Sequence, residues 1–205
     1  MSTATENERL ILEAAESEFL AKGFNGAKTT AIAQKAGVTH AMLHYYYRTK
    51  ENLFDKVFRE KSQMIAHSFE MILNDHLSFE GIIKNFVRTH FQFVKQNPRL
   101  ANFICNEVLN NKANRDILHD SIFPKLTQIY TLVAELVDEE IAKGTIKPIK
   151  PLDLILNIVS LNICTFMTYP LMKDYAPDYS DAEYEQLLKE REESNVQFIW
   201  NALRK

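Results

Sequence analysis

The sequence contains few of the residues that interrupt helices. Its 205 residues include only five glycines and six prolines, so few positions are set aside for tight turns. Hydrophobic residues make up 46% and charged residues 25% of the chain, which fits a compact protein rather than a disordered one. We therefore predict an all-α fold of about nine helices joined by short connections.

Signals for secretion or membrane insertion are also scarce. Residues 1–8 are polar and lack an apolar stretch after basic residues, so they do not form a secretory signal. The longest apolar stretch, residues 152–171, is interrupted by polar side chains that would lack partners in hydrocarbon, and it predicts a buried or interface helix. Cys105 and Cys164 have no C-x-x-C spacing and suit a reducing compartment. These features predict a cytoplasmic protein.

Basic character is absent from the chain as a whole, because its formal net charge is -3. Between Leu20 and Lys61, however, eight basic residues stand against three acidic ones, an excess of five positive charges. The remainder of the chain must then carry a net charge of -8. This asymmetry is what we expect if one end of the molecule meets phosphates while the rest stays soluble.

Hydrophobic periodicity and capping residues locate four helices in the first third of the chain. The expected segments are 7–22, which stops at Gly23; a short helix from Thr29 or Thr30 to Ala36; a third from Thr39 to about Tyr46; and a long fourth from Thr49 to Ile72. Threonine hydroxyls suit the start of each of the last three, because they accept hydrogen bonds from free backbone N–H groups. Gly37 suits the end of the second helix, where a left-handed residue is favourable only without a Cβ.

The rest of the chain also has helical signals throughout. Ser78 opens one helix, Asn97 followed by Pro98 opens the next, and a longer helix covers about 115–143 and ends at Gly144. Residues 148–151 form a rigid joint before a helix over 152–167 and a loop over 169–179. Ser180 and Glu183 have the spacing of a capping box for the last helix.

The second and third short helices, joined by an Ala-Gly-Val turn, form a predicted helix-turn-helix, whose second helix enters the major groove of DNA. Small or branched apolar residues hold the two helices together: Ile32, Ala33, Ala36, Val38 and Leu43. The side chains left facing outward at the third helix can reach base edges or phosphates: Thr39, His40, His44 and Tyr45.

The run from Thr29 to Leu53 resembles the DNA-binding region of the tetracycline-repressor family, whose usual pattern is Ile-Ala-x-x-Ala-Gly-Val-Ser followed by Leu-Tyr-x-Tyr-Phe-x-x-Lys-Glu-x-Leu. The match extends over residues 7–58. It is specific, because the turn, the aromatic cluster and Lys-Glu-x-Leu occur together at the right spacings. The resemblance implies a DNA-binding domain over residues 1–48, a ligand-binding and dimerisation domain over 49–205, and a long linking helix that starts near residue 49.

The resemblance also implies roles for individual residues. Thr29 or Thr30, Tyr46 and Lys50 would contact phosphate, and Thr39 would cap the recognition helix close to the DNA backbone. His40 and Tyr45 fall where the family varies and reads sequence. Three residues depart from the family pattern: Ala41 for glycine, His44 for tyrosine and Tyr47 for phenylalanine. We interpret Tyr47 as a core aromatic residue that attaches the third helix to the first.

In the larger domain the resemblance is one of architecture. It implies a ligand-responsive repressor that binds a pseudo-palindromic operator as a homodimer and is released by a small, largely apolar effector. The candidate ligand-pocket residues are Phe86, His90, Phe93, Phe103, Asn106, Tyr130 and Phe166. The candidate dimer-interface residues, which have the spacing of paired helices, are Ile155, Ile158, Val159, Ile163, Val196, Ile199, Trp200 and Leu203.

Other interpretations stay open. The effector could be a protein partner rather than a small molecule. A helical enzyme could use His67, His90 and His119 with carboxylates as acid and base groups, but no Glu-x-x-His cluster, nucleophile elbow or phosphate loop supports it. His40 and His44 could hold a metal, yet no third ligand lies in their helix. We therefore predict no enzymatic activity, no cofactor, no metal and no membrane partner.

Overall fold

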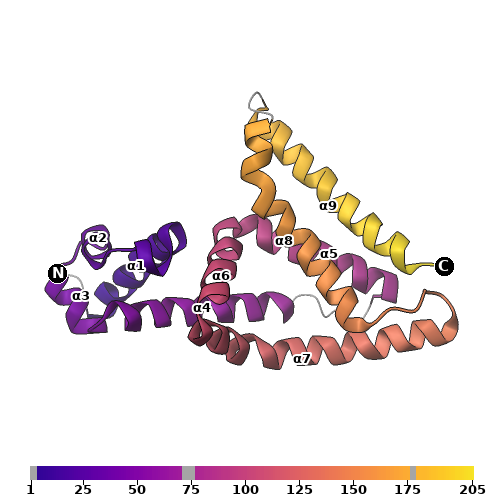
Figure 1. Ribbon diagram of the computed structural model, residues 1–205, viewed down its shortest axis with the longest axis horizontal. Coiled ribbons are helices and arrows are strands. Elements are labelled where there is room, and N and C mark those ends of the chain that lie inside the picture. Colours follow the sequence, from indigo (N-terminus) through magenta and orange to yellow (C-terminus); the bar gives the residue numbers. More distant parts are fainter. Residues whose placement is uncertain (1–3, 71–76, 176–178) are drawn as a thin grey trace. The chain divides into compact units, whose positions relative to one another are not determined.

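The computed structural model describes residues 4–70, 77–175 and 179–205. Within these ranges the chain forms nine α-helices and no strand, apart from an isolated antiparallel bridge between Ile146 and Arg204 (Figure 1). The prediction of an all-α fold is confirmed. The helices are α1 (Ala4–Gly26), α2 (Thr29–Lys35), α3 (His40–Tyr47), α4 (Lys50–Glu70), α5 (Phe79–Gln96), α6 (Pro98–Asn110), α7 (Lys112–Lys143), α8 (Pro151–Tyr175) and α9 (Asp181–Leu203).

Several predicted helix boundaries are confirmed by their capping geometry. The hydroxyl of Ser78 accepts a hydrogen bond from Gly81 N–H at 3.2 Å at the start of α5. Pro98 is the first residue of α6. At α9 both halves of the predicted capping box are present, because Ser180 N–H donates to the Glu183 carboxylate at 2.7 Å and Glu183 N–H donates to the Ser180 hydroxyl at 3.3 Å.

Other predicted boundaries are wrong. The residue that precedes α2 is Lys28 and no side chain caps that helix, so the predicted threonine cap is absent. The helix that was expected to end near residue 167 continues to Tyr175. At Gly23 the backbone is not helical (φ 66°, ψ 179°), yet a helical turn resumes after it, so α1 has a kink where its end was expected. Ile72, the expected end of the fourth helix, lies outside the described residues.

The chain divides into two compact units. The first contains Met1–Met64 and Arg99–Ile122, and the second contains Ile65–Pro98 and Phe123–Lys205. Helices α4, α6 and α7 each belong to both units, because the division falls inside them, although only the first residue of α6, Pro98, belongs to the second unit. This division reflects contacts within the chain. The predicted boundary between a DNA-binding domain and a ligand-binding domain at residues 48 and 49 concerns function, and it stays a prediction.

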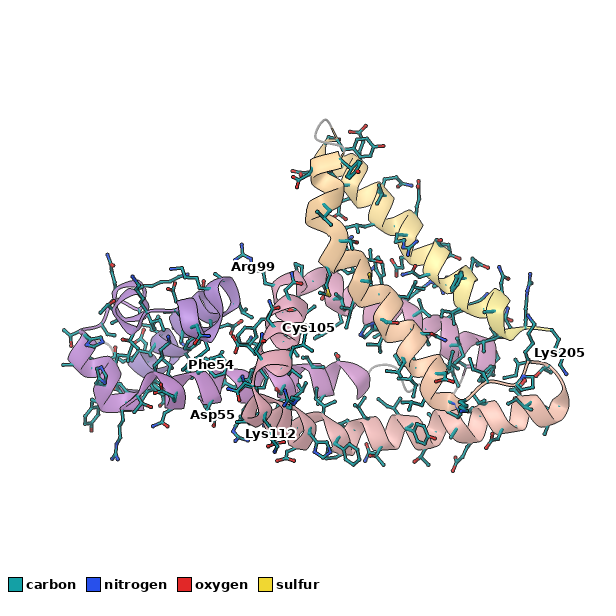
Figure 2. The ribbon with its side chains drawn as sticks, viewed as in Figure 1. Phe54, Asp55, Arg99, Cys105, Lys112 and Lys205 are labelled. Atoms are coloured by element: carbon teal, nitrogen blue, oxygen red, sulfur yellow. The ribbon has the colours of Figure 1, made fainter. Side chains whose placement is uncertain are left out.

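An aromatic cluster forms the core of the first unit. Phe54 on α4 is 5% exposed and is the central ring of this cluster (Figure 2). Its ring centroid lies 5.1 Å from that of Phe19 and 5.0 Å from that of Phe24, both on α1. Phe103 on α6 lies 5.8 Å from both Phe54 and Phe58. Edge-on and tilted contacts of this kind stabilise aromatic pairs beyond simple burial, so α1, α4 and α6 are held together by one set of rings.

The second unit packs α5 against α8 and α9, and its core contains a polar network among apolar side chains. The side-chain amide of Asn162 on α8 donates to the Val87 carbonyl at 2.9 Å and to Nδ1 of His90 at 3.2 Å. Its oxygen accepts a hydrogen bond from the Asn195 amide of α9 at 3.0 Å. Since the amide nitrogen of Asn162 can only donate, Nδ1 of His90 is the acceptor, and the neutral His90 ring carries its proton on Nε2. The network links three helices at fixed positions along their lengths.

Tyr47 provides a test of packing in the first unit. It is only 8% exposed, which agrees with its interpretation as a core aromatic residue, and its hydroxyl has no hydrogen-bond partner among the described residues. Burial raises the pKa of this phenol. Because an unpaired buried hydroxyl costs free energy, we expect Tyr47→Phe to raise the free energy of unfolding by about 1 kcal/mol in urea titrations. Tyr45→Phe, at an exposed position, should change it by less than about 0.5 kcal/mol. A destabilised Tyr47→Phe variant would contradict this account.

His90 makes a second prediction, about pH. Burial lowers the pKa of His90 from 6.5 to about 4, because the charged ring is poorly solvated there. The unfolded chain therefore binds a proton more readily than the folded chain, so stability is intact above pH 6.5 and is lost as the pH falls toward 4. The loss due to His90 approaches about 3 kcal/mol. His90→Gln retains an acceptor for Asn162 but cannot titrate, so its unfolding free energy should fall less between pH 7 and pH 4.5. His119→Gln, which replaces an exposed histidine in the first unit, is the matched control variant.

Candidate nucleic-acid interface

The turn between α2 and α3 is built on Gly37. This residue has a φ of 68°, in the left-handed region that glycine adopts without strain. Its N–H donates to the Gln34 carbonyl at 3.2 Å, and Val38 N–H donates to the Ala33 carbonyl at 3.0 Å. This pair of bonds closes the carboxyl end of α2 and turns the chain toward the next helix. The Thr39 hydroxyl then accepts a hydrogen bond from Met42 N–H at 3.2 Å and caps α3, as predicted.

The residues predicted to hold the two short helices together point inward. Ile32, Ala33, Ala36 and Leu43 are all buried, and Val38 is half-buried. On α3 the buried side chains are Leu43 and Tyr47, four residues apart on one face of the helix. This face fixes the rotation of α3 about its axis.

The opposite face of α3 is open to solvent. His40, Ala41 and His44 are exposed, and Tyr45 is 82% exposed, so none of them is covered by the unit in which it lies. Of the other candidate DNA-binding residues, Thr30 and Thr39 are exposed, and Thr29, Tyr46 and Lys50 are partly exposed. All eight lie on the α2 to α4 segment of the first unit.

The exposed histidines of α3 are held by specific contacts. Nε2 of His40 lies 3.0 Å from the Thr29 hydroxyl, which joins α2 to α3 across the open face. The His40 and His44 rings meet edge to face with centroids 4.4 Å apart. Nδ1 of His44 lies 2.8 Å from the Arg48 carbonyl, and a carbonyl only accepts, so Nδ1 carries the proton. A neutral His44 therefore presents Nε2 outward as an acceptor, and only a protonated ring can donate to a phosphate or to a guanine.

Lys50 lies at the start of α4, with its ammonium over an aromatic ring. Its ammonium lies 4.6 Å above the ring centroid of Phe24, within range of a cation–π contact. The preceding residue, Thr49, caps α4, because its hydroxyl accepts a hydrogen bond from Asn52 N–H at 3.1 Å. The sequence analysis identified Thr49 and Lys50 but missed Phe24. The signal available in the sequence was that Phe24 directly follows Gly23.

The candidate ligand-pocket residues are divided between the two units. Phe103 and Asn106 belong to the first unit and line a cavity there. The other five belong to the second unit: Phe86 and His90 are buried, Phe166 packs on Phe91 with ring centroids 5.0 Å apart, Phe93 is partly exposed, and Tyr130 is 43% exposed. Of these five, Phe93 lines a pocket of about 390 Å³ together with Ser68 and Glu192.

Most of the candidate dimer-interface residues face the interior of their own unit. Ile155, Ile158, Val196, Ile199 and Leu203 are each no more than 8% exposed, whereas Val159, Ile163 and Trp200 are partly exposed. The spacing correctly marked an apolar face on α8 and α9, but this face packs within the chain and the five buried side chains are not available to a partner. The exposed apolar side chains of these helices lie elsewhere, at Leu152, Leu156, Met167, Leu171 and Phe198.

The described ranges were also compared with what a metal site, a histidine-based enzyme site or a membrane span would require. No group of three or more histidine, cysteine, aspartate or glutamate side chains there could hold a metal ion. His119 lies in the first unit, 3.2 Å from the Asp120 carboxylate, whereas His67 and His90 belong to the second. Residues Pro151–Thr168 are long and apolar enough to span a membrane, but only by length and composition, and core helices pass the same test.

Comparison with known proteins places this geometry in context. Residues 11–57 match the family model described as bacterial regulatory proteins, tetR family. The chain is 27% identical over 150 residues to the HTH-type transcriptional regulator RutR of Escherichia coli K12, which covers 73% of this chain and 69% of that protein. It is 22% identical over 137 residues to the fatty acid metabolism regulator protein of Bacillus subtilis, covering 67% and 69% of the two chains.

Solved structures share the fold along almost the whole chain. A Clostridium perfringens protein described as a candidate fatty acid metabolism regulator superposes with a TM-score of 0.69 at 20% identity, over 94% of this chain and 97% of that one. A mutant of the protein HlyIIR, with a linker in place of a segment, superposes with a TM-score of 0.61 at 20% identity, over 99% and 100% of the two chains. At these identities the likeness concerns the fold alone.

Proposed function

This chain belongs to the tetR family of bacterial transcriptional regulators, and from that premise we propose that it is a ligand-responsive repressor that binds a pseudo-palindromic operator as a homodimer in the cytoplasm. Its recognition helix is α3, one copy per subunit. The two copies would enter successive major grooves about one helical turn apart, or slightly more.

The observation that carries the proposal is the two-sided character of α3. Leu43 and Tyr47 are buried on one face, while His40, His44 and Tyr45 are exposed on the other. In this role Thr29, Thr30, Tyr46 and Lys50 contact phosphates, Thr39 caps the helix beside the DNA backbone, and His40, His44 and Tyr45 face the groove. The local excess of five positive charges between Leu20 and Lys61 supports the same assignment.

Dimerisation is proposed for the exposed faces of α8 and α9. On α8, Leu152 and Leu156 stand one turn apart and are 52% and 53% exposed. On α9, Phe198 is 65% exposed. Large apolar side chains left open on two adjoining helices suit a self-complementary interface. This face takes the place of the buried one that spacing alone had selected.

The effector is proposed to act through α4. This helix starts at Lys50 in the first unit and passes into the second unit after Met64. A small molecule that binds one conformation of the helical domain better than another would change the separation of the two α3 helices and thereby the operator affinity.

The proposal is tested by mapping protection of the DNA upstream of the gene for this protein and of adjoining genes. We expect a symmetric protected site with two half-sites. At that site Lys50→Gln should weaken binding to specific and non-specific DNA alike. It should also flatten the plot of log affinity against log salt by about 0.9 for each phosphate that is no longer neutralised, or roughly two for a dimer. Lys189→Gln, at an exposed position on α9, should leave the slope unchanged. A Lys50→Gln slope equal to that of the wild type would refute the role of Lys50 at a phosphate.

The dimer face is tested with Phe198→Glu. A charge on this open apolar position should dissociate the dimer in sedimentation equilibrium. It should also weaken operator binding at least a hundredfold, because linked half-sites bind far more tightly than single ones. Lys189→Glu also places a carboxylate on an exposed position of α9 and should remain dimeric. A dimeric Phe198→Glu protein with full operator affinity would remove α9 from the interface.

A further inference from the structure

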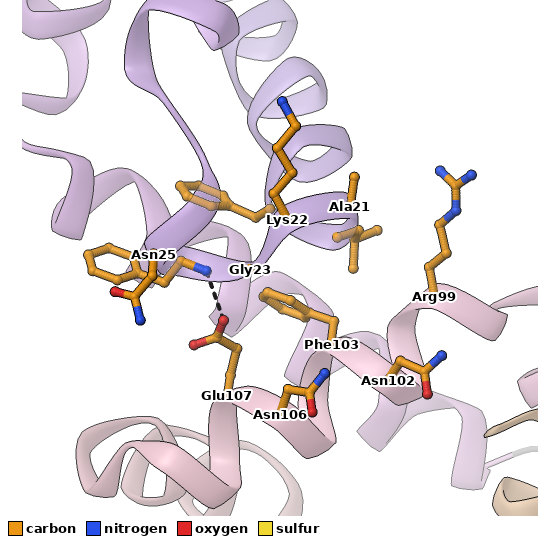
Figure 3. Close-up of a pocket in the computed structure, with 12 residues that line it drawn as sticks. Ala21, Lys22, Gly23, Asn25, Arg99, Asn102, Phe103, Asn106 and Glu107 are labelled. Carbon is orange, nitrogen blue, oxygen red and sulfur yellow. Dashed lines mark hydrogen bonds between the residues drawn. The ribbon is translucent and has the colours of Figure 1, made fainter.

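A cavity of about 500 Å³ lies in the first unit between the carboxyl end of α1 and helix α6. Figure 3 shows its lining, with Lys22 and Asn25 from α1 and Arg99, Asn102, Asn106 and Glu107 from α6. Its volume is within the range of small-molecule sites in proteins. Three phenylalanines line it: Phe24 is partly exposed, and Phe19 and Phe103 lie beneath at 0% and 4% exposed, so the floor of the cavity is apolar.

Several polar side chains of the lining form no bond within the part of the protein that the structure describes. Within residues 4–70, 77–175 and 179–205, the Arg99 guanidinium and the side-chain amides of Asn25, Asn102 and Asn106 make no hydrogen bond or ion pair to another residue. Arg99, Asn102 and Asn106 are spaced along one side of α6, and the Arg99 side chain extends from the start of that helix (Figures 2 and 3). A guanidinium and a side-chain amide three residues apart on one side of a helix, as in Arg99 and Asn102, are donors suited to a planar anion such as a carboxylate.

The charges around the cavity limit what it can hold. Lys22 is already paired with Glu18, its ammonium 2.7 Å from that carboxylate. Glu107 adds a negative charge to the wall, although its oxygens are engaged. Oε1 accepts a hydrogen bond from Phe24 N–H at 2.8 Å, and Oε2 accepts one from the Asn114 amide at 3.4 Å. Arg99 is therefore the cation left for a ligand, and the nearby Glu107 disfavours a doubly charged one.

We propose that this cavity binds a small organic monoanion, with its carboxylate against Arg99 and the amide of Asn102, and its flat apolar body against Phe24 and Phe103. The site lies in the first unit and includes two of the seven candidate ligand-pocket residues, Phe103 and Asn106, whereas the other five belong to the second unit.

The location of the site gives it a route to the DNA-binding surface. At Gly23 the kink in α1 frees the N–H of Phe24, and Glu107 binds that group. A Cβ at Gly23 would lie 3.0 Å from the Glu107 carboxylate, so the two helices approach closely at this point. The Phe24 ring in turn packs on Phe54 and lies under the Lys50 ammonium. An occupant of the cavity would touch the segment that supports Lys50. This step rests on the proposed function.

Binding is tested on the full chain without DNA. Benzoate, its uncharged analogue benzamide, and inorganic phosphate are titrated while backbone amide signals are followed by NMR. We expect saturable shifts for benzoate at Phe24 and along residues 102–107, with affinities at least tenfold weaker for benzamide and for phosphate. Arg99→Gln changes an exposed side chain and should weaken benzoate at least tenfold, whereas Lys189→Gln should not. The proposed site would be contradicted if the shifts appeared elsewhere or not at all. It would also be contradicted if benzoate and benzamide bound equally well, or if the affinity for benzoate were unchanged in Arg99→Gln.

The route to the DNA is tested separately with a gel-shift titration of the operator. Benzoate at saturation should change operator affinity at least threefold in the wild type and should have no effect in Arg99→Gln. Unchanged affinity in the wild type would overturn the coupling but leave the NMR result for the site intact. If the chain bound no duplex specifically, the proposed function would fail, and the NMR result would still decide whether the site exists.

Discussion

The burial of one face of α3 is the constraint on which the account depends. Leu43 and Tyr47 are packed inside the first unit, and this packing decides which side chains of an eight-residue helix remain outside. The turn at Gly37 and the Thr39 cap set where the helix begins. Without that packing, His40, His44 and Tyr45 would have no fixed direction, and the positive charge around them would be only a solvated surface.

The two units use different means to define their cores. The first relies on aromatic rings from α1, α4 and α6, and its one orphan buried polar atom among the described residues is the Tyr47 hydroxyl. The second contains a buried His90, Asn162 and Asn195 network, which requires α5, α8 and α9 to meet in a single register for its hydrogen bonds to form. The apolar side chains left over on α8 and α9, such as Leu156 and Phe198, are then free for a second subunit. A buried polar network and exposed large apolar side chains on the same helices are consistent with assembly.

Local signals in the sequence located the helices and the turn, because capping residues and Gly37 act within four residues of where they stand, but they misplaced the cap of α2 and the ends of α1 and α8. The inward and outward residues of the α2 to α3 segment were also predictable, since they follow the helical period. The larger errors depend on contacts between distant residues. The periodicity of α8 and α9 marked Ile158 and Val196 as apolar but could not show that the same chain covers them. Nor could it reveal the cavity beside Gly23, because Glu107 lies more than eighty residues from Phe24 along the chain.

The most direct measurement is diethyl pyrocarbonate modification of the histidines, followed by mass spectrometry with and without operator duplex. Because α3 is expected to lie in the major groove, bound DNA should slow modification of His40 and His44 at least tenfold. It should leave exposed His119, which lies outside the α2 to α4 segment, unchanged. Equal modification of His40 and His44 in free and DNA-bound protein would contradict the assignment of α3 as the recognition helix.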